Sequence, residues 1–235
     1  MKFTRPLPKF DPRSVPVVGI DDHLEGVAAR HLTPAALRAR FLHPPTWVPE
    51  HSVEKKFADR EPAAAAVLVP LVMRDELTLL LTLRTANLST HSGQVAFPGG
   101  RTDSTDRDAT DTALREAEEE IGLPRDHVEV LGQLPIYVTG TAFIITPVVA
   151  LVTPGFVLRP NPGEVADVFE VPLSYLMNPA HHRRHEFEFD GVTRQWLSMP
   201  YVERGTEPNA GLSVERYIWG ATAGMLRNLY RFLSA

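Results

Sequence analysis

The sequence contains no cysteine, which excludes disulfides, thiol catalysis and zinc or iron–sulfur centres held by cysteine. It also has no apolar run of the roughly 18–20 residues that a membrane span requires. Residues 1–16 are rich in proline and polar side chains, and they show no signal-peptide pattern. These absences predict a cytoplasmic protein with no membrane partner.

Positive charge is not in excess, since the formal net charge at pH 7 is −5 and lysine and arginine are scattered along the chain. We therefore expect no nucleic-acid partner. The 235 residues have an ordinary globular composition, with 43% hydrophobic and 23% charged residues. This length and composition allow one domain with a sizeable core, with or without an extension.

The first 60 residues differ from the rest of the chain. Prolines recur there and favour an extended arm, at Pro6, Pro8, Pro12 and Pro16. Thr33 and Pro34 form a good N-cap and first-turn pair for a helix that runs to about Phe41. A further short helix is expected around 21–29. We divide the chain into an N-terminal proline-rich and helical extension, 1–60, and a catalytic domain, 61–235.

The catalytic domain is predicted to begin with two neighbouring strands, 65–73 and 77–83, joined by a turn at 74–76. Their nearly continuous apolar character indicates burial on both faces of a sheet. Pro70 favours an edge position or a bulge for the first strand. Later strands are expected at 128–138, 142–152 and 165–171, then a short helix at 172–177. A hairpin turns at Asp190-Gly191, and a strand becomes an amphipathic helix after Tyr217.

Residues 97–123 carry the most informative pattern. Phe97-Pro98-Gly99-Gly100 reads as the end of a strand that turns sharply, where glycine lets the backbone approach a ligand closely. A helix follows an acidic loop, with Asp108 as its N-cap and Gly122 as its C-cap. Its apolar stripe consists of Ala113, Leu114, Ala117 and Ile121.

Three carboxylates crowd the other side of this helix, because Glu116, Glu119 and Glu120 stand at positions i, i+3 and i+4. Arg115 can pair with Glu119, but one cation cannot neutralise three anions. A solvated acidic face is the ordinary interpretation of such a run. The preceding Gly-Gly turn and acidic loop favour the other interpretation, a hard divalent cation such as Mg²⁺ held by carboxylate oxygens.

This stretch resembles the Nudix box, which reads G, five residues, E, seven residues, R-E-U-x-E-E-x-G-U, with U aliphatic. Residues 115–123 match the second half of the box at every position. The first half departs from it, because fourteen residues instead of thirteen separate Gly100 from Arg115 and the early acidic residue is Asp106 rather than Glu.

Other segments resemble the coenzyme A pyrophosphatase subgroup of the Nudix hydrolase superfamily. They are the stretch from Leu80 to the FPGG turn, including Arg84 and Gly93, the segment 137–149 with its YVTGTAF start, and IWGATA at 218–223. The subgroup signature has Ser or Ala where this chain has Thr85, and a second Arg where it has Ser89.

The resemblance implies an α/β fold, a Nudix-type α/β/α sandwich with a mixed, partly antiparallel sheet. It implies a metal-dependent diphosphatase that cleaves coenzyme A or its derivatives into 3′,5′-ADP and 4′-phosphopantetheine or its acyl form. Mg²⁺ or Mn²⁺ would be held by Glu116, Glu119, Glu120 and the Gly100 carbonyl, with Arg115 orienting a carboxylate. Arg84 would bind phosphate, beside the backbone of Gly99 and Gly100.

Several alternatives stay open at this stage. The substrate could be another nucleoside diphosphate derivative, such as ADP-ribose or a dinucleoside polyphosphate, or the chain could be a non-catalytic nucleotide-binding regulator. The resemblance also allows a homodimer, although no motif marks an interface. Glu164 is either the general base or a surface carboxylate. For His181, His182 and His185 we expect a solvated loop rather than a metal site, and for His91 a structural loop role.

Overall fold

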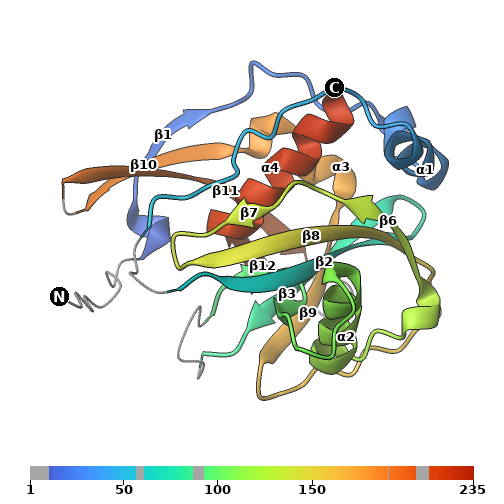
Figure 1. Cartoon of the computed structure of the whole chain (residues 1–235). Coiled ribbons are helices and arrows are strands. Elements are labelled where there is room, and N and C mark those ends of the chain that lie inside the picture. Colours follow the sequence, from blue (N-terminus) through green and yellow to red (C-terminus); the bar gives the residue numbers. More distant parts are fainter. Residues whose placement is uncertain (1–10, 57–60, 87–92, 190, 205–211) are drawn as a thin grey trace.

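The computed structural model describes residues 11–56, 61–86, 93–189, 191–204 and 212–235 (Figure 1). Its α-helices are α1 (Pro34–Leu42), α2 (Ala109–Ile121), α3 (Leu173–Leu176) and α4 (Gly220–Ser234), and short 3₁₀ turns lie at Pro12–Ser14, Ala29–His31, Arg125–His127 and Pro179–His181. Its strands are β1 (Val17–Ile20), β2 (Ala63–Met73), β3 (Leu77–Arg84), β4 (Val95–Ala96), β5 (Gly99–Arg101), β6 (Val128–Gln133), β7 (Tyr137–Val138), β8 (Phe143–Val152), β9 (Val165–Pro172), β10 (Arg183–Phe189), β11 (Val192–Arg204) and β12 (Ser213–Trp219).

Two sheets organise these strands. Strands β2 to β9 form a mixed sheet with the central order β4-β3-β2-β8-β6, in which β2 and β8 are parallel and the other pairs are antiparallel. Strands β1, β10, β11 and β12 form an antiparallel sheet, which reaches past the first sheet as a long ribbon (Figure 1). The mixed, partly antiparallel sheet is the one that the sequence predicted.

Helices cover both faces of the mixed sheet. Helix α2 buries its predicted apolar stripe, with Ala113, Ala117 and Ile121, against one face. The opposite face packs against α4, where Leu226 and Leu229 are fully buried, and against inward side chains of β11 and β12. The result is the expected α/β/α sandwich. Within the described part of the chain, no helix combines the length and the apolar character needed to cross a bilayer.

Pro70 does not mark an edge strand, contrary to the sequence prediction. Strand β2 lies between β3 and β8 and pairs with β8 along almost its whole length. On its other side, β2 pairs with β5 up to Val67 and with β3 only from Leu71. Pro70 therefore lies in a gap between two ladders, where its missing N–H removes no ladder hydrogen bond.

The N-terminal extension packs against the rest of the chain. Helix α1 begins at Pro34 with Thr33 as its N-cap, as predicted, whereas the segment 21–28 forms no helix. Val53 bridges Val138 of β7, and the Glu54 N–H donates to the Val138 carbonyl over 2.8 Å. The extension thus forms a single β-bridge at the edge of β7.

A buried ionic network also holds the extension. Arg227 of α4, which is 1% exposed, donates to Glu50 over 2.7 Å and lies 3.2 Å from Asp21. Arg184 of β10 donates to the same two carboxylates, each over 2.7 Å. Burial raises the pKa of Glu50, but the hydrogen bonds from both arginines outweigh it and bring the pKa to about 2.

The histidines at 181–185 do not form the solvated loop that we expected. His182 is fully buried, with Nε2 2.8 Å from the Leu176 carbonyl and Nδ1 3.0 Å from Arg227. His185 is also buried, and its Nε2 lies 2.8 Å from Ser198 Oγ. His181 stacks on Tyr175 at 3.8 Å between ring centroids. The burial of His182 and His185 depends on partners far away in the chain, such as Arg227 and Ser198, and was not visible in the local sequence.

Candidate active site

The Gly99-Gly100 turn lies directly against helix α2. Strand β5 pairs Gly99 and Gly100 with β2, and this brings the turn over the acidic side of the helix. A Cβ on Gly99, whose φ is +155°, would lie 2.5 Å from the Ala66 carbonyl. A Cβ on Gly100 would lie 2.4 Å from Glu116 Oε2. Gly99 therefore requires glycine, because a side chain there would meet backbone atoms, whereas a side chain at Gly100 would displace the Glu116 carboxylate.

Glu120 is the most buried carboxylate of the helix, with 3% of its surface exposed. The Gly99 N–H donates to Glu120 Oε2 over 3.1 Å, and Arg84 Nη1 lies 3.4 Å from Oε1. Burial raises the pKa of Glu120 to about 7, although these two contacts act in the opposite direction. The predicted phosphate-binding residue Arg84 is thus brought next to a predicted metal ligand.

The other two predicted ligands differ in exposure. The side chain of Glu116 is 17% exposed, whereas that of Glu119 is 61% exposed. Burial raises the pKa of Glu116 as well, and repulsion from Glu119 and Glu164 adds to it. Repulsion from Glu116 in turn contributes to the raised pKa of Glu120. The helix therefore presents a concentrated negative potential.

Arg115 lies at the rim of this carboxylate group and binds Asp106 with two hydrogen bonds, Nε to Oδ1 over 2.8 Å and Nη2 to Oδ2 over 2.9 Å. Its Nη1 donates to Glu116 and Glu119, each over 3.0 Å. Hydrogen bonding with Arg115 holds the pKa of Asp106 well below its usual range. The loop between Gly100 and helix α2 thus accommodates one residue more than the Nudix spacing has, and Asp106 still contacts Arg115.

Glu164 faces the same carboxylates from a loop outside the helix. The Asn161 N–H donates to the Glu120 carbonyl at the C-terminal end of α2, over 2.8 Å. The Asn161 side chain donates to Glu164 Oε1 over 3.2 Å, and the Thr85 N–H donates to the Glu164 carbonyl over 2.9 Å. Because the charge of Glu164 raises the pKa of both Glu116 and Glu120, its carboxylate lies within their electrostatic reach.

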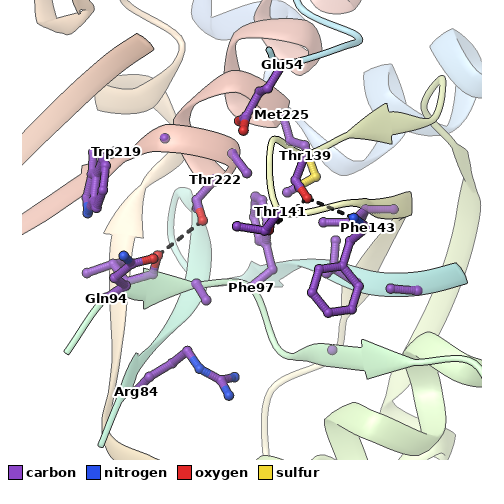
Figure 2. A pocket seen from close by; sticks show the side chains of 18 of the residues that line it. Glu54, Arg84, Gln94, Phe97, Thr139, Thr141, Phe143, Trp219, Thr222 and Met225 are labelled. Atoms are coloured by element: carbon purple, nitrogen blue, oxygen red, sulfur yellow. Dashed lines mark hydrogen bonds between the residues drawn. The ribbon is translucent and has the colours of Figure 1, made fainter. Parts of the chain in front are cut away.

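A cavity of about 660 Å³ opens beside the glycine turn (Figure 2). The lining of the cavity includes Arg84 at the end of β3 and Gly99, Gly100 and Arg101 of β5. The remaining walls come from distant segments: Gln94–Phe97, Thr139–Phe143, Trp219–Met225, and Arg13 and Glu54 of the extension. The extension thus contributes side chains to the cavity.

The comparison with known proteins decides the family. A NUDIX domain model matches residues 62–198, which is more than half of the chain. The chain belongs to the Nudix family. An uncharacterized Nudix hydrolase of Photorhabdus laumondii, NudL, is 53% identical over 165 residues, which cover 70% of this chain and 82% of that protein. The Escherichia coli NudL, also described as uncharacterized, is 41% identical over 166 residues, covering 70% of this chain and 80% of its own.

Solved structures give a looser likeness. A Caenorhabditis elegans Ap4A hydrolase matches 50% of this chain and 85% of its own, with 18% identity and a TM-score of 0.41. This likeness does not bear on the substrate. The family relationship makes the chain a Nudix hydrolase of the pyrophosphatase kind, which acts on small diphosphate compounds.

The Nudix helix offers donors that suit the divalent ion used throughout the family. No three acidic or histidine side chains of the described residues already converge on a single point, and Arg115 Nη1 stands between Glu116 and Glu119. The donor set nevertheless consists only of oxygen atoms, which hard cations prefer. Burial disfavours the charged forms of Glu116 and Glu120 and raises their pKa values, so a cation bound by both carboxylates would offset that cost.

Sequence reasoning missed residues that come from outside the Nudix helix. It nominated no residue of the extension as part of the site, yet Arg13 and Glu54 line the cavity. It noticed the segments 137–149 and 218–223 without assigning roles to Thr139 or Trp219. The predictions for Ser89 and His91 fall outside the described residues.

Proposed function

We propose that this Nudix hydrolase cleaves the diphosphate bond of coenzyme A or its acyl derivatives. The observation that carries this proposal is the composition of the cavity. The three segments that resemble the coenzyme A pyrophosphatase subgroup lie far apart in the sequence, yet residues of all three line one cavity beside the Nudix helix. If the similarity of these three segments to the subgroup were a coincidence, there would be no reason for the segments to lie at one site.

The chain's own residues have distinct tasks in this reaction. Arg84 places a guanidinium at the mouth of the carboxylate group, where it binds a phosphate oxygen of the substrate. Gly99 and Gly100 line the cavity, where their backbone groups can bind the diphosphate. Arg115 is held by Asp106, and its hydrogen bonds orient the carboxylates of Glu116 and Glu119.

Glu116, Glu119, Glu120 and the Gly100 carbonyl would hold Mg²⁺ or Mn²⁺, which when bound neutralises diphosphate oxygens and acidifies water. Water adds to one phosphorus, and the bridging oxygen leaves with the other phosphate. From coenzyme A this gives 3′,5′-ADP and 4′-phosphopantetheine. Glu164, held by Asn161 and within electrostatic reach of the same carboxylates, is the candidate to accept the proton of that water.

The deciding experiment incubates purified protein and Mg²⁺ separately with coenzyme A, ADP-ribose and a diadenosine polyphosphate, and separates the products by chromatography. Preferential release of 3′,5′-ADP from coenzyme A supports the proposal. Turnover confined to the other diphosphates keeps the Nudix mechanism and overturns the coenzyme A assignment. No turnover of any substrate would instead favour a nucleotide-binding regulator.

A further inference from the structure

Glu54 comes from the N-terminal extension but lies in the wall of the cavity. Two neighbours fix its carboxylate: the Tyr137 hydroxyl donates to Oε1 over 2.8 Å, and the Gly140 N–H donates to Oε2 over 2.8 Å. Its own N–H is bound to the Val138 carbonyl over 2.8 Å. Backbone and side chain are both held, so the carboxylate cannot turn away from the cavity.

The fold makes specific room for this arrangement. A Cβ on Gly224, inside helix α4, would lie 2.5 Å from the Tyr137 hydroxyl oxygen. A glycine within a helix is less favourable than alanine, so its presence calls for a packing reason. Here the glycine lets Tyr137 reach Glu54. Residues of three separate segments, Glu54, Tyr137 and Gly224, thus determine the position of one carboxylate.

Among the residues that the structure describes, no lysine, arginine or histidine forms an ion pair with the Glu54 carboxylate. The neighbouring Lys55 donates to the Thr193 carbonyl instead. Each Glu54 oxygen accepts one hydrogen bond and keeps further acceptor capacity. A fixed anion in a cavity wall attracts N–H and O–H donors and repels negative groups.

The cavity therefore has two chemically different ends. Figure 2 shows Arg84 at one end and Glu54 at the other, with Phe97 and Thr141 between them. The Arg84 end adjoins Glu120 and suits the diphosphate. The Glu54 end, bordered by Met225 and Thr139, suits an uncharged group that carries hydrogen-bond donors.

We propose that Glu54 is a specificity-determining residue, which binds an uncharged N–H or O–H donor on the substrate and rejects substrates with a negative charge at that position. The inference rests on the proposed function, because it takes the cavity as the substrate site. In coenzyme A two groups offer the required chemistry: the exocyclic amino group of the adenine, and the amide and hydroxyl donors of the pantetheine half.

The test compares substrate ratios in the wild type and in Glu54→Gln, using two matched pairs. The first pair is coenzyme A and its hypoxanthine analogue, which has an oxo group in place of the amino group. The second pair is acetyl- and malonyl-coenzyme A, which differ by one carboxylate at the acyl end. Glu61→Gln removes an exposed carboxylate of a nearby segment and serves as the control. A ratio of kcat/KM values is insensitive to partial misfolding.

We expect one ratio to move by about tenfold or more in Glu54→Gln and neither to move in Glu61→Gln. If Glu54→Gln loses the preference for coenzyme A over its hypoxanthine analogue, Glu54 binds the adenine amino group. If Glu54→Gln gains turnover of malonyl-coenzyme A relative to acetyl-coenzyme A, Glu54 lies beside the pantetheine half. Tyr137→Phe, which frees one Glu54 oxygen, should raise KM more than it lowers kcat.

Two unchanged ratios in Glu54→Gln would overturn the role of Glu54. The failure of the proposed function looks different, because the wild type itself would not hydrolyse coenzyme A. If the wild type then hydrolyses ADP-ribose or the diadenosine polyphosphate, the adenine and hypoxanthine forms of that compound provide the same ratio, and an unchanged ratio overturns the inference there as well. If the wild type hydrolyses none of the three compounds, the cavity is not a diphosphatase site and the inference falls with it.

Discussion

Gly100 lies so close to Glu116 that a methyl group on its Cα would stand 2.4 Å from one carboxylate oxygen and 2.6 Å from the other. Replacing Gly100 by alanine must therefore displace the Glu116 carboxylate. We expect Gly100→Ala to lower kcat/KM by at least about a hundredfold, since small displacements of catalytic groups are that costly. Gly26→Ala is the matched control, because its Cβ would meet only ordinary contacts at 3.7 Å. Wild-type activity in Gly100→Ala would contradict the assignment of Glu116.

The two hydrogen bonds from Arg115 to Asp106 lead to a second prediction. In Asp106→Asn the charge that anchors Arg115 is lost, and the guanidinium becomes free to bind Glu116 and Glu119 more tightly. We expect about a tenfold fall in kcat and a higher Mg²⁺ concentration at half-maximal rate. Asp126→Asn changes the same charge at an exposed position and should behave as the wild type. Equal Mg²⁺ dependence in both variants would argue against a positioning role for Asp106.

Metal binding can be measured on the protein without substrate. We expect Glu116→Gln and Glu119→Gln each to weaken Mn²⁺ binding by about tenfold or more, because each removes a charged oxygen donor. Glu118→Gln lies on the same helix but pairs with Arg125 over 3.2 Å, so it serves as the control. Calorimetric titration of the four proteins gives the comparison. Unchanged affinity in Glu119→Gln would remove that residue from the metal site.

The pKa of Glu120 predicts a pH dependence of the metal-free protein. Its folded pKa, raised by burial to about 7, lies above its ordinary value of 4.5, so the folded state binds more protons between these values. Stability from this group is therefore present below pH 4.5 and is lost as the pH rises towards 7. At about 1.4 kcal/mol per pKa unit, the loss is on the order of 3 kcal/mol.

The measurement is the difference in unfolding free energy between the wild type and Glu120→Gln, at pH 5 and pH 7.5 in chelator. His182 makes the difference necessary, because burial lowers its pKa to about 4 and its contribution changes in the opposite direction over the same range. We expect Glu120→Gln to gain stability relative to the wild type as the pH rises. A constant difference would show that Glu120 ionises normally.

Local sequence predicted the Nudix helix well, because its determinants are local. Asp108 caps the helix and accepts the Asp111 N–H over 2.9 Å, and Gly122 ends the helix with a φ of +66°. The same reasoning gave most strands and the final helix. It was wrong about Pro70 and about the histidines near 182, because the gap between two ladders and the burial of His182 and His185 are set by residues far away in the chain.

The cavity could be predicted only in part for the same reason. The resemblance pointed to the right segments, but nothing in the sequence around Glu54 says that it meets Tyr137, which lies 83 positions later. A carboxylate in a proline-rich extension has the local appearance of any surface residue. Its role depends on the contacts of three segments, which only the folded chain brings together.

The buried network around Arg227 predicts how the extension is held. In Arg227→Met, Asp21 and Glu50 lose a buried partner, and removal of one member of a buried ion pair costs roughly 3–5 kcal/mol. Arg38→Met breaks an exposed pair with Glu129 instead and should leave the stability almost unchanged, because solvent screens such a pair. Urea unfolding compares the two variants. Equal stabilities would mean that the network does not anchor the extension.

The Nudix helix and the cavity depend on very different lengths of chain. The glycine turn and the three glutamates lie within residues 99–120, whereas the cavity needs side chains from Arg13 to Met225. Contacts close in sequence form and survive more readily than contacts that close long loops. Under mild denaturing stress the enzyme should therefore lose its ability to discriminate between substrates before it loses its ability to bind metal, passing through a state that still carries the carboxylates but no longer selects what reaches them.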